Sequence, residues 1–271
     1  MINFFIKGIG LFTFAPYESK RVLFEFDFII TKSIPLSQFI PKFIFFDLDD
    51  TLLNHKKAEQ NGLADVHQHF PEVQSVPLAH LKETYHQINK GLWEEYGRGE
   101  IDRHILHRMR FEETFLALGI MPSLYEEAGK VYMNYYRNHW EWIDGAEATY
   151  KRIAEQFPVG IITNGFAETQ QMKIDQFGFA ESARHIVISE EIGVMKPHPK
   201  IFDHATALAG VEREEILYVG DSYTSDVVGG LNAGWKVAWL TSQRPTHQNG
   251  QAATWVMEDL KELPDLLQIP A

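Results

Sequence analysis

The stretch FIFFDLDDTLL, residues 43–53, decides the fold of this chain. Phe and Ile favour a buried β-strand, so Phe43–Phe46 predicts a central strand that ends at Asp47. Ionised carboxylates are costly to bury, yet Asp47, Asp49 and Asp50 follow this strand directly. The two-residue period of a strand points Asp47 and Asp49 the same way, so they converge. The stretch therefore predicts a site for a divalent cation, with a strand end and a solvated turn as the alternative.

Composition narrows the classes of protein that the chain can represent. Its 271 residues are 45% hydrophobic and 23% charged, as in a globular protein with one large domain or a domain with an insertion. A net charge of -12 and a pI near 5.4 argue against binding a nucleic acid polymer. The absence of cysteine excludes disulfides and thiol nucleophiles and fits a cytoplasmic location. No apolar run reaches the roughly eighteen residues of a membrane helix, so no membrane partner is expected.

Residues 1–40 differ from the rest of the chain. Their charges nearly cancel, whereas the remainder carries the acidity. The apolar segment at residues 1–16 faintly resembles a signal peptide, but no small-residue cleavage pattern follows it. We expect residues 1–40 to be an N-terminal extension of uncertain order.

Two kinds of periodicity follow the opening strand. Apolar residues recur every three or four positions from Leu78 to Leu92, which predicts a helical insertion over residues 56–143. From Asp144 onward, helical stretches alternate with short apolar strands, expected at 159–163, 186–189, 216–220, 237–240 and 254–256. This alternation predicts an α/β core with a Rossmann-like parallel sheet flanked by helices, made of residues 41–55 and 144–271.

Polar residues lie at four loops of this predicted sheet. Besides Asp47, they are Thr163-Asn164-Gly165, Lys196, Asp221 and Asp226. The helix after Gly165 is expected to offer free first amides to an anion. Each residue alone has an ordinary explanation as a helix cap or a solvated charge. Ligands bind beyond the carboxyl ends of parallel strands, so the four loops together predict one site.

The spacing of these residues resembles the haloacid dehalogenase (HAD) superfamily of phosphohydrolases. The resemblance covers about residues 42–262, with Asp-x-Asp-x-Thr at 47–51, Thr163, Lys196 and Gly-Asp-x(4)-Asp at 220–226. The insertion is similar to the α-helical cap of subfamily I. The segments INKGLW, IITNGF and VISEEIG, at 88–93, 161–166 and 187–193, resemble bacterial pyrimidine 5′-nucleotidases of the YjjG type.

The resemblance implies a phosphomonoester hydrolase that uses Mg²⁺ and an aspartyl-phosphate intermediate. Asp47 would be the nucleophile and Asp49 the general acid and base. Thr163 and Lys196 would be the other catalytic residues, binding and neutralising the phosphoryl group. The metal ligands implied are Asp47, the backbone carbonyl of Asp49, Asp221 and Asp226.

Substrate-binding residues are expected in the core and in the cap. Asn164 and Gly165 would bind the phosphoryl group, and Asn89, Lys90 and Trp93 would contact base or sugar. Aromatic residues at helical spacing more often pack in a core, so Trp93 has that alternative. Asp50 and Thr51 are expected to shape the turn. The histidines show no metal-binding spacing, and most are expected at the surface, among them His55, His67, His69, His104, His107 and His139.

The expected substrate is a nucleoside monophosphate, and the chain is expected to be a monomer or homodimer. A sugar-phosphate phosphatase or a phosphoglucomutase-like enzyme has the same fold with a different cap. A 2-haloacid dehalogenase is disfavoured because Asp49 is present. A phosphonatase would need a Schiff-base lysine such as Lys82 or Lys90. The intact set of Asp47, Asp49, Lys196 and Asp221 argues against a non-catalytic binding module.

Overall fold

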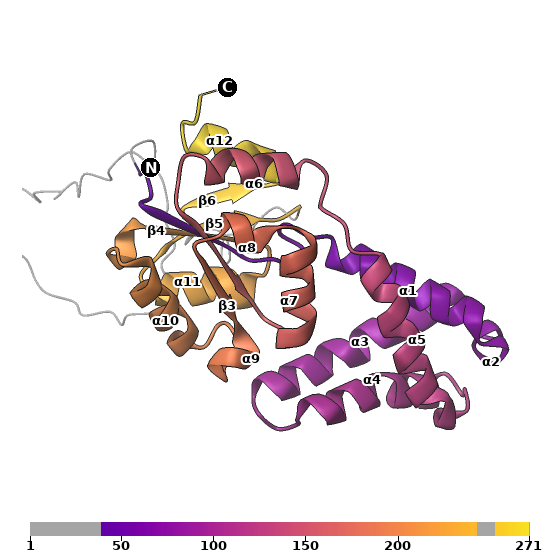
Figure 1. The fold of residues 1–271 in the computed structure, drawn as a ribbon. Coiled ribbons are helices and arrows are strands. Elements are labelled where there is room, and N and C mark those ends of the chain that lie inside the picture. The colour runs from indigo at the N-terminus through magenta and orange to yellow at the C-terminus, as the bar shows by residue number, and fades with distance from the viewer. Residues whose placement is uncertain (1–38, 243–252, 271) are drawn as a thin grey trace, which may run out of the picture. The chain divides into compact units, whose positions relative to one another are not determined.

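Strand β1 (Phe43–Phe46) lies in the middle of a parallel sheet in the computed structural model, which describes residues 39–242 and 253–270 (Figure 1). Within these residues the sheet has six strands in the order β3-β2-β1-β4-β5-β6. The other strands are β2 (Val159–Thr163), β3 (His185–Ile188), β4 (Ile216–Gly220), β5 (Lys236–Leu240) and β6 (Trp255–Met257). The predicted α/β class with a Rossmann-like parallel sheet is confirmed.

Helices connect and flank these strands. The α-helices are α1 (His55–His69), α2 (Pro71–Gln74), α3 (Leu78–Gly97), α4 (Arg103–Ala117), α5 (Tyr125–Asn138), α6 (Ala146–Ala154), α7 (Ala167–Gln176), α8 (Phe179–Ser182), α9 (Ser189–Ile192), α10 (Pro199–Ala209), α11 (Val228–Asn232) and α12 (Leu263–Leu266). Short 3₁₀ turns cover Pro122–Leu124, Arg213–Glu215 and Leu260–Glu262, and a π-helical turn covers Tyr223–Val227.

The strand limits differ from the sequence prediction at three strands. Strand β3 begins at His185 and stops at Ile188, because Ser189 starts the turn of α9 and accepts a hydrogen bond from Gly193 N–H. Strand β5 begins one residue earlier than predicted, since Lys236 pairs with Leu217. Strand β6 runs one residue later than predicted.

The side chains of β1 alternate between two apolar layers. Ile44 and Phe46 belong to a cluster with residues of α6, α7 and α12. Phe43 and Phe45 belong to another cluster, with residues of α10 and the strands beside them. Because both faces of the sheet are covered, every residue of β1, β2 and β4 is buried, and burial of their apolar area stabilises the fold.

The helices α1 to α5, here called the inserted helices, have an apolar cluster of their own. Tyr85 of α3, Phe111 of α4 and Tyr132 of α5 meet there, with ring centroids 5.0 to 5.5 Å apart. Two antiparallel connections join these helices to β1 and α6, with Asn54 N–H donating to Glu141 O and Ile143 N–H to Leu52 O. Figure 1 shows the inserted helices grouped beyond one edge of the sheet.

The domain limits proposed from sequence stay predictions. All described residues fall in a single compact unit, Leu36–Ala271. The expected N-terminal extension, residues 1–40, lies outside the described residues except for its last two. Among the helices described, none combines the length and the apolar character needed to cross a bilayer.

A glycine in β2 provides a test of the sheet packing. We predict that Gly160→Ala lowers the free energy of unfolding by about 1–3 kcal/mol, as overpacking of a core does. The added Cβ would lie 2.4 Å from Cε1 of Phe45 and 2.9 Å from the carbonyl oxygen of His185. Urea unfolding followed by circular dichroism measures the change.

The matched control is Gly91→Ala in the middle of α3. No atom lies within 4 Å of a Cβ built at Gly91, so alanine is expected to stabilise this helix by about 0.5–1 kcal/mol. Equal unfolding midpoints for the two variants would contradict the packing assigned to β2.

Candidate active site

Three carboxylates meet where strands β1 and β4 end. Asp47 follows β1 and Asp221 follows β4, and these strands are neighbours, with Phe46 paired to Val219. Asp226 reaches the same place from the π-helical turn. Oxygen atoms of Asp47, Asp221 and Asp226 all lie within 4.8 Å of one another. The strand order reverses between β1 and β4, which is where open parallel sheets bind ligands.

The Lys196 ammonium lies at the centre of this group and is 2% exposed. Its Nζ donates to Asp47 Oδ1 at 2.6 Å and to Asp226 Oδ1 at 2.8 Å. It also lies 2.6 Å from the Tyr218 hydroxyl oxygen and 3.1 Å from the Ile162 carbonyl oxygen. Burial favours the neutral amine, but the carboxylates outweigh it and raise the pKa of Lys196, so the side chain stays charged.

The surroundings of Asp47 and Asp221 disfavour the ionised form of their carboxyl groups. Burial raises the pKa of Asp47 well above its usual range, and repulsion from Asp226 and Asp221 adds to this against the attraction of Lys196. Burial, with Asp226, raises the pKa of Asp221 to about 6. Thr51 donates to Asp47 Oδ2 at 3.1 Å and so holds the second carboxylate oxygen.

The charges in this region fit a divalent cation. Lys56 Nζ lies 3.3 Å from carboxylate oxygens of both Asp50 and Asp221. Among the residues that the structure describes, the four carboxylates of Asp47, Asp50, Asp221 and Asp226 face two ammonium groups, those of Lys56 and Lys196. Two negative charges remain, and hard carboxylate oxygens are the ligands that Mg²⁺ prefers. The residues predicted as side-chain metal ligands are therefore brought together.

Asp49 is placed apart from this group, against the expectation from strand alternation. Strand β1 ends at Phe46, so the two-residue period of a strand does not extend to Asp49. Its carboxylate instead binds Lys173 Nζ at 2.7 and 2.8 Å. A contact of the Asp49 carbonyl with a cation stays a prediction.

Lys173 and Gln170 are polar residues of α7 that the sequence reading missed, and both are 2% exposed. Gln170 Nε2 donates to Asp49 Oδ2 at 3.1 Å and to the Thr163 hydroxyl. Burial opposes ionisation of Asp49, but Lys173 outweighs it, so the pKa of Asp49 lies below its usual value. Gln170 and Lys173 are three residues apart on the helix that follows β2, at positions where apolar residues usually face the sheet. Polar residues at these positions are the feature of the sequence that indicates a functional role.

The loop after β2 is hydrogen-bonded to the loop that carries Lys196. Asn164 Oδ1 accepts from Lys196 N–H at 2.8 Å, and Asn164 Nδ2 donates to Lys196 O at 3.1 Å. Gly165 N–H donates to Ser189 Oγ at 3.0 Å. One of the first amides of α7, expected to be free, is occupied, because Ala167 N–H donates to Glu190 Oε2 at 2.7 Å. The side chain of Asn164 thus positions Lys196.

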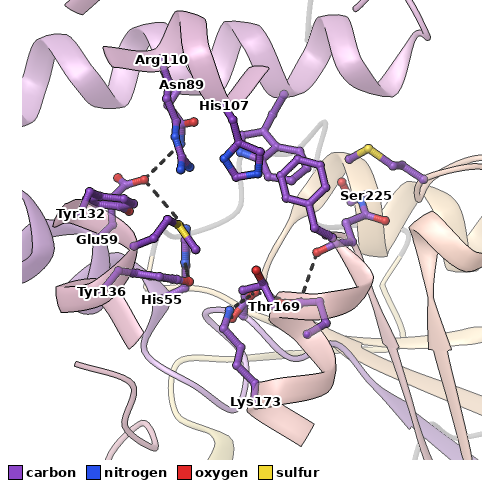
Figure 2. A pocket seen from close by; sticks show the side chains of 18 of the residues that line it. His55, Glu59, Asn89, His107, Arg110, Tyr132, Tyr136, Thr169, Lys173 and Ser225 are labelled. Atoms are coloured by element: carbon purple, nitrogen blue, oxygen red, sulfur yellow. Dashed lines mark hydrogen bonds and ion pairs between the residues drawn. The ribbon is translucent and has the colours of Figure 1, made fainter. Parts of the chain in front are cut away.

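A cavity of about 380 Å³ extends from this site to the inserted helices. Asp49, Asn164 and Gly165 line it at the core, and Asn89 and Trp93 line it from α3 (Figure 2). A neighbouring cavity of about 830 Å³ shares Asn89, Trp93 and Asn164 and adds Lys90 and Lys196. The predicted substrate-binding residues therefore line two adjoining cavities.

Trp93 packs at the contact between α3 and the loop after β2. Its ring centroid lies 4.9 Å from that of Phe166 and 5.6 Å from that of Tyr96. It belongs to a small cluster separate from the main core of the inserted helices. Trp93 thus combines a packing role with a place on the cavity wall.

Two histidines expected at the surface line the same cavity. His55 lies against Tyr136, with Nδ1 2.8 Å from the hydroxyl oxygen. The ring of His107 packs against Phe166 in a tilted arrangement, with the ring centroids 4.7 Å apart. Burial, with the charges of Arg110 and Arg103, lowers the pKa of His107 to about 3, so this imidazole is neutral at physiological pH.

Known proteins resemble this chain over most of its length. The family model described as haloacid dehalogenase-like hydrolase matches residues 44–240. The pyrimidine 5′-nucleotidase YjjG of Escherichia coli is 35% identical over 225 residues, which are 83% of this chain and 96% of that protein. The glyceraldehyde 3-phosphate phosphatase of Pyrococcus furiosus is 30% identical, over 84% of this chain and 92% of that protein.

A solved structure matches as well. The HAD-hydrolase YfnB of Bacillus subtilis, in a structure bound to magnesium, superposes with a TM-score of 0.72 at 27% sequence identity. The match covers 85% of this chain and 100% of that chain.

The low pKa of His107 makes stability depend on pH in a way that a variant can isolate. Unfolded histidine titrates near about 6.5, so below that pH the unfolded state binds the extra proton and the folded state loses stability. We predict that acidification from pH 7 to 4.5 destabilises the wild type more than His107→Gln, by on the order of 1–2 kcal/mol. Urea unfolding at several pH values measures the difference, and parallel curves would contradict it.

Proposed function

This chain belongs to the haloacid dehalogenase-like hydrolases, and we propose that it hydrolyses the 5′-phosphate of pyrimidine nucleoside monophosphates with the aid of Mg²⁺. Its membership confirms the prediction of a hydrolase. The observation that carries the proposal is the Asp47 carboxylate at the end of β1, held by Lys196 beside Asp221 and Asp226. This arrangement joins a fixed oxygen nucleophile to the positive charge that a phosphoryl group requires.

In the first step an oxygen of Asp47 attacks phosphorus. The Asp47 O–P bond forms as the ester P–O bond breaks, and the ester oxygen leaves with the electron pair and a proton from Asp49. Hydrogen bonds from Lys196 and Thr51 fix the orientation of the Asp47 carboxylate before the reaction. Splitting one difficult displacement into two easier steps is what a covalent intermediate contributes.

In the second step water attacks the aspartyl phosphate. Asp49 accepts a proton from this water, phosphate leaves, and Asp47 is restored as a carboxylate. The ion pair with Lys173 favours the ionised form of Asp49, which suits a base. This ionised form is the one that the proposed second step requires, and protonation of Asp49 would prepare it for the first step.

The carboxylates of Asp47, Asp221 and Asp226 would hold Mg²⁺. When bound, this cation supplies charge that offsets the phosphoryl oxygens and draws them toward Asp47. The magnesium in the YfnB structure supports the assignment, as does the surplus of two negative charges around Lys56 and Lys196.

The relatives support a nucleotide substrate and leave a sugar phosphate as the alternative. YjjG, named a pyrimidine 5′-nucleotidase, is 35% identical to this chain. The Pyrococcus protein at 30% identity is named a glyceraldehyde 3-phosphate phosphatase, which favours a sugar phosphate as the second candidate. A cytoplasmic location and a monomeric or homodimeric state stay predictions.

A panel of phosphomonoesters tests the proposed function. With Mg²⁺, we expect kcat/KM for UMP, dUMP and dTMP to exceed that for glucose 6-phosphate, ribose 5-phosphate and glyceraldehyde 3-phosphate at least tenfold. Chelation of divalent cations is expected to abolish turnover. Asp47→Asn serves as the control, because an amide at this position cannot form the acyl phosphate while the packing is retained. Higher turnover of the sugar phosphates, or substantial activity of Asp47→Asn, would refute the proposal.

Replacement of Lys173 tests the assignment of Asp49. We predict that Lys173→Met lowers kcat on UMP about 10- to 100-fold with little change in KM. This loss is smaller than the rate enhancement of about 10²–10⁴ that general acid–base catalysis supplies, because Asp49 itself is retained. Lys173→Arg is expected to recover part of the loss, because it keeps a cation beside Asp49. Lys151→Met, at an exposed lysine of α6, is the matched control. Equal kcat for wild type and Lys173→Met would contradict the positioning role.

A further inference from the structure

Arg110 is a buried cation of α4. The residue is 6% exposed, and its Nε is buried without a hydrogen-bond partner among the described residues. Its contacts are with aromatic rings, since Cζ lies 5.2 Å from the centroid of Tyr132 and 5.9 Å from that of Phe111. Guanidinium groups buried away from water normally bind acceptors through several N–H groups. Figure 2 shows the side chain extending from α4 toward the cavity.

Asn89 of α3 lines the same cavity as Arg110 and carries an acceptor without a donor among the described residues. Asn89 is 7% exposed, and its Nδ2 donates to Glu59 Oε2 at 3.2 Å. This hydrogen bond holds the amide with Nδ2 on the side of Glu59. Asn89 Oδ1 therefore points away from Glu59 and has no partner among the described residues. In Figure 2 both Arg110 and Asn89 lie at the end of the cavity that the inserted helices form.

These two groups lie at the opposite end of the cavity from the catalytic residues. Lys173 is at the other end in Figure 2, where Asp49 also lines the cavity. The volume of about 380 Å³ is within the range of about 300–1,000 Å³ that small-molecule sites occupy. Trp93, Phe166 and neutral His107 supply aromatic walls between the two ends. A ligand that spans the cavity thus has its phosphate at the core and a flat group at Arg110.

We propose that Arg110 and the amide oxygen of Asn89 recognise the base of the substrate through a carbonyl oxygen and the adjacent ring N–H. Arg110 donates to the carbonyl, and Asn89 Oδ1 accepts from the N–H. This edge is present in uracil and thymine at O4 or O2 and N3–H. In cytosine N3 is an acceptor, which would face the Asn89 oxygen without a hydrogen between them. The inference rests on the proposed function and specifies its substrates as UMP, dUMP and dTMP over CMP.

Polar mismatches of this kind discriminate strongly in buried sites. A site built to hydrogen-bond one group rejects an analogue that leaves its buried polar atoms unpaired. Since Glu59 prevents the Asn89 amide from flipping, the oxygen cannot be exchanged for the donor nitrogen when cytosine binds. Glu59 is 5% exposed, and His86 Nδ1 lies 3.2 Å from its Oε1. Because Glu59 is held in this position, the orientation of the Asn89 amide favours a ring N–H over a ring acceptor.

Variant kinetics on the full chain with Mg²⁺ test the proposal. We expect Arg110→Met to lower kcat/KM for UMP about 10- to 100-fold, mainly through KM, as loss of a hydrogen bond from a charged group does. Ribose 5-phosphate has no base, so its kcat/KM is expected to change less than twofold. Arg108→Met, at an exposed neighbour on α4 that pairs with Glu112, is the matched control and is expected to leave both substrates unchanged. Equal losses on UMP and ribose 5-phosphate would overturn the proposal.

Nucleoside inhibitors test the same edge without any variant. Uridine is expected to inhibit the hydrolysis of ribose 5-phosphate by the wild type, and 3-methyluridine, whose N3–H is replaced by a methyl group, at least tenfold more weakly. The control is 5-methyluridine, which keeps the edge and is expected to inhibit like uridine. No inhibition by uridine, or equal inhibition by uridine and 3-methyluridine, would overturn the assignment. Failure of the proposed function is separate, because it is read from the turnover of UMP by the wild type.

Discussion

The Lys196 ammonium between Asp47 and Asp226 is the interaction on which the site depends. A buried cation and two buried anions are each unfavourable alone, and they become tolerable only when they are neighbours. The three side chains come from the end of β1, the loop before α10 and the π-helical turn after β4. Asn164 binds the backbone of Lys196 on both sides and so ties a fourth segment to the same point. The electrostatic requirement thereby fixes four loops of the sheet together.

A second buried lysine gives the two acids different environments. Burial raises the pKa of Asp47, which shares Lys196 with Asp226, whereas Lys173 outweighs burial at Asp49 and the pKa of Asp49 is lowered. Asp47 and Asp49 are two positions apart in the sequence, yet their pKa values shift in opposite directions. The residues that cause this difference come from distant parts of the chain. Pairs of acids with different environments are how one site supports a nucleophile and a proton carrier. In this chain the difference arises from α7 and from the loop before α10.

The inserted helices supply the part of the cavity that the core cannot. The carboxyl ends of the strands offer carboxylates, an ammonium group and a hydroxyl, which suit a phosphoryl group in any ester. Discrimination among esters requires groups that contact the rest of the molecule, and Asn89 and Arg110 belong to α3 and α4. Asn89 Oδ1 and Arg110 Nε are buried and lack partners among the described residues, a cost that a bound ligand would remove. The chemical step and the choice of substrate therefore lie on separate parts of the chain.

The sequence by itself determined the parallel sheet and the loops at which Asp47, Thr163, Lys196 and Asp221 lie. These features could be predicted because apolar strands and their spacing are local patterns, and because parallel sheets bind ligands at the carboxyl ends of their strands. Only the tertiary structure decided which groups face one another: Lys173 against Asp49, Glu190 against the start of α7, and Arg110 toward the cavity. The sequence of a helix shows which residues share a face, but the partner of that face comes from segments distant in the chain. For that reason the FIFFDLDDTLL stretch indicated the chemistry, while the partners of its acids required the folded chain.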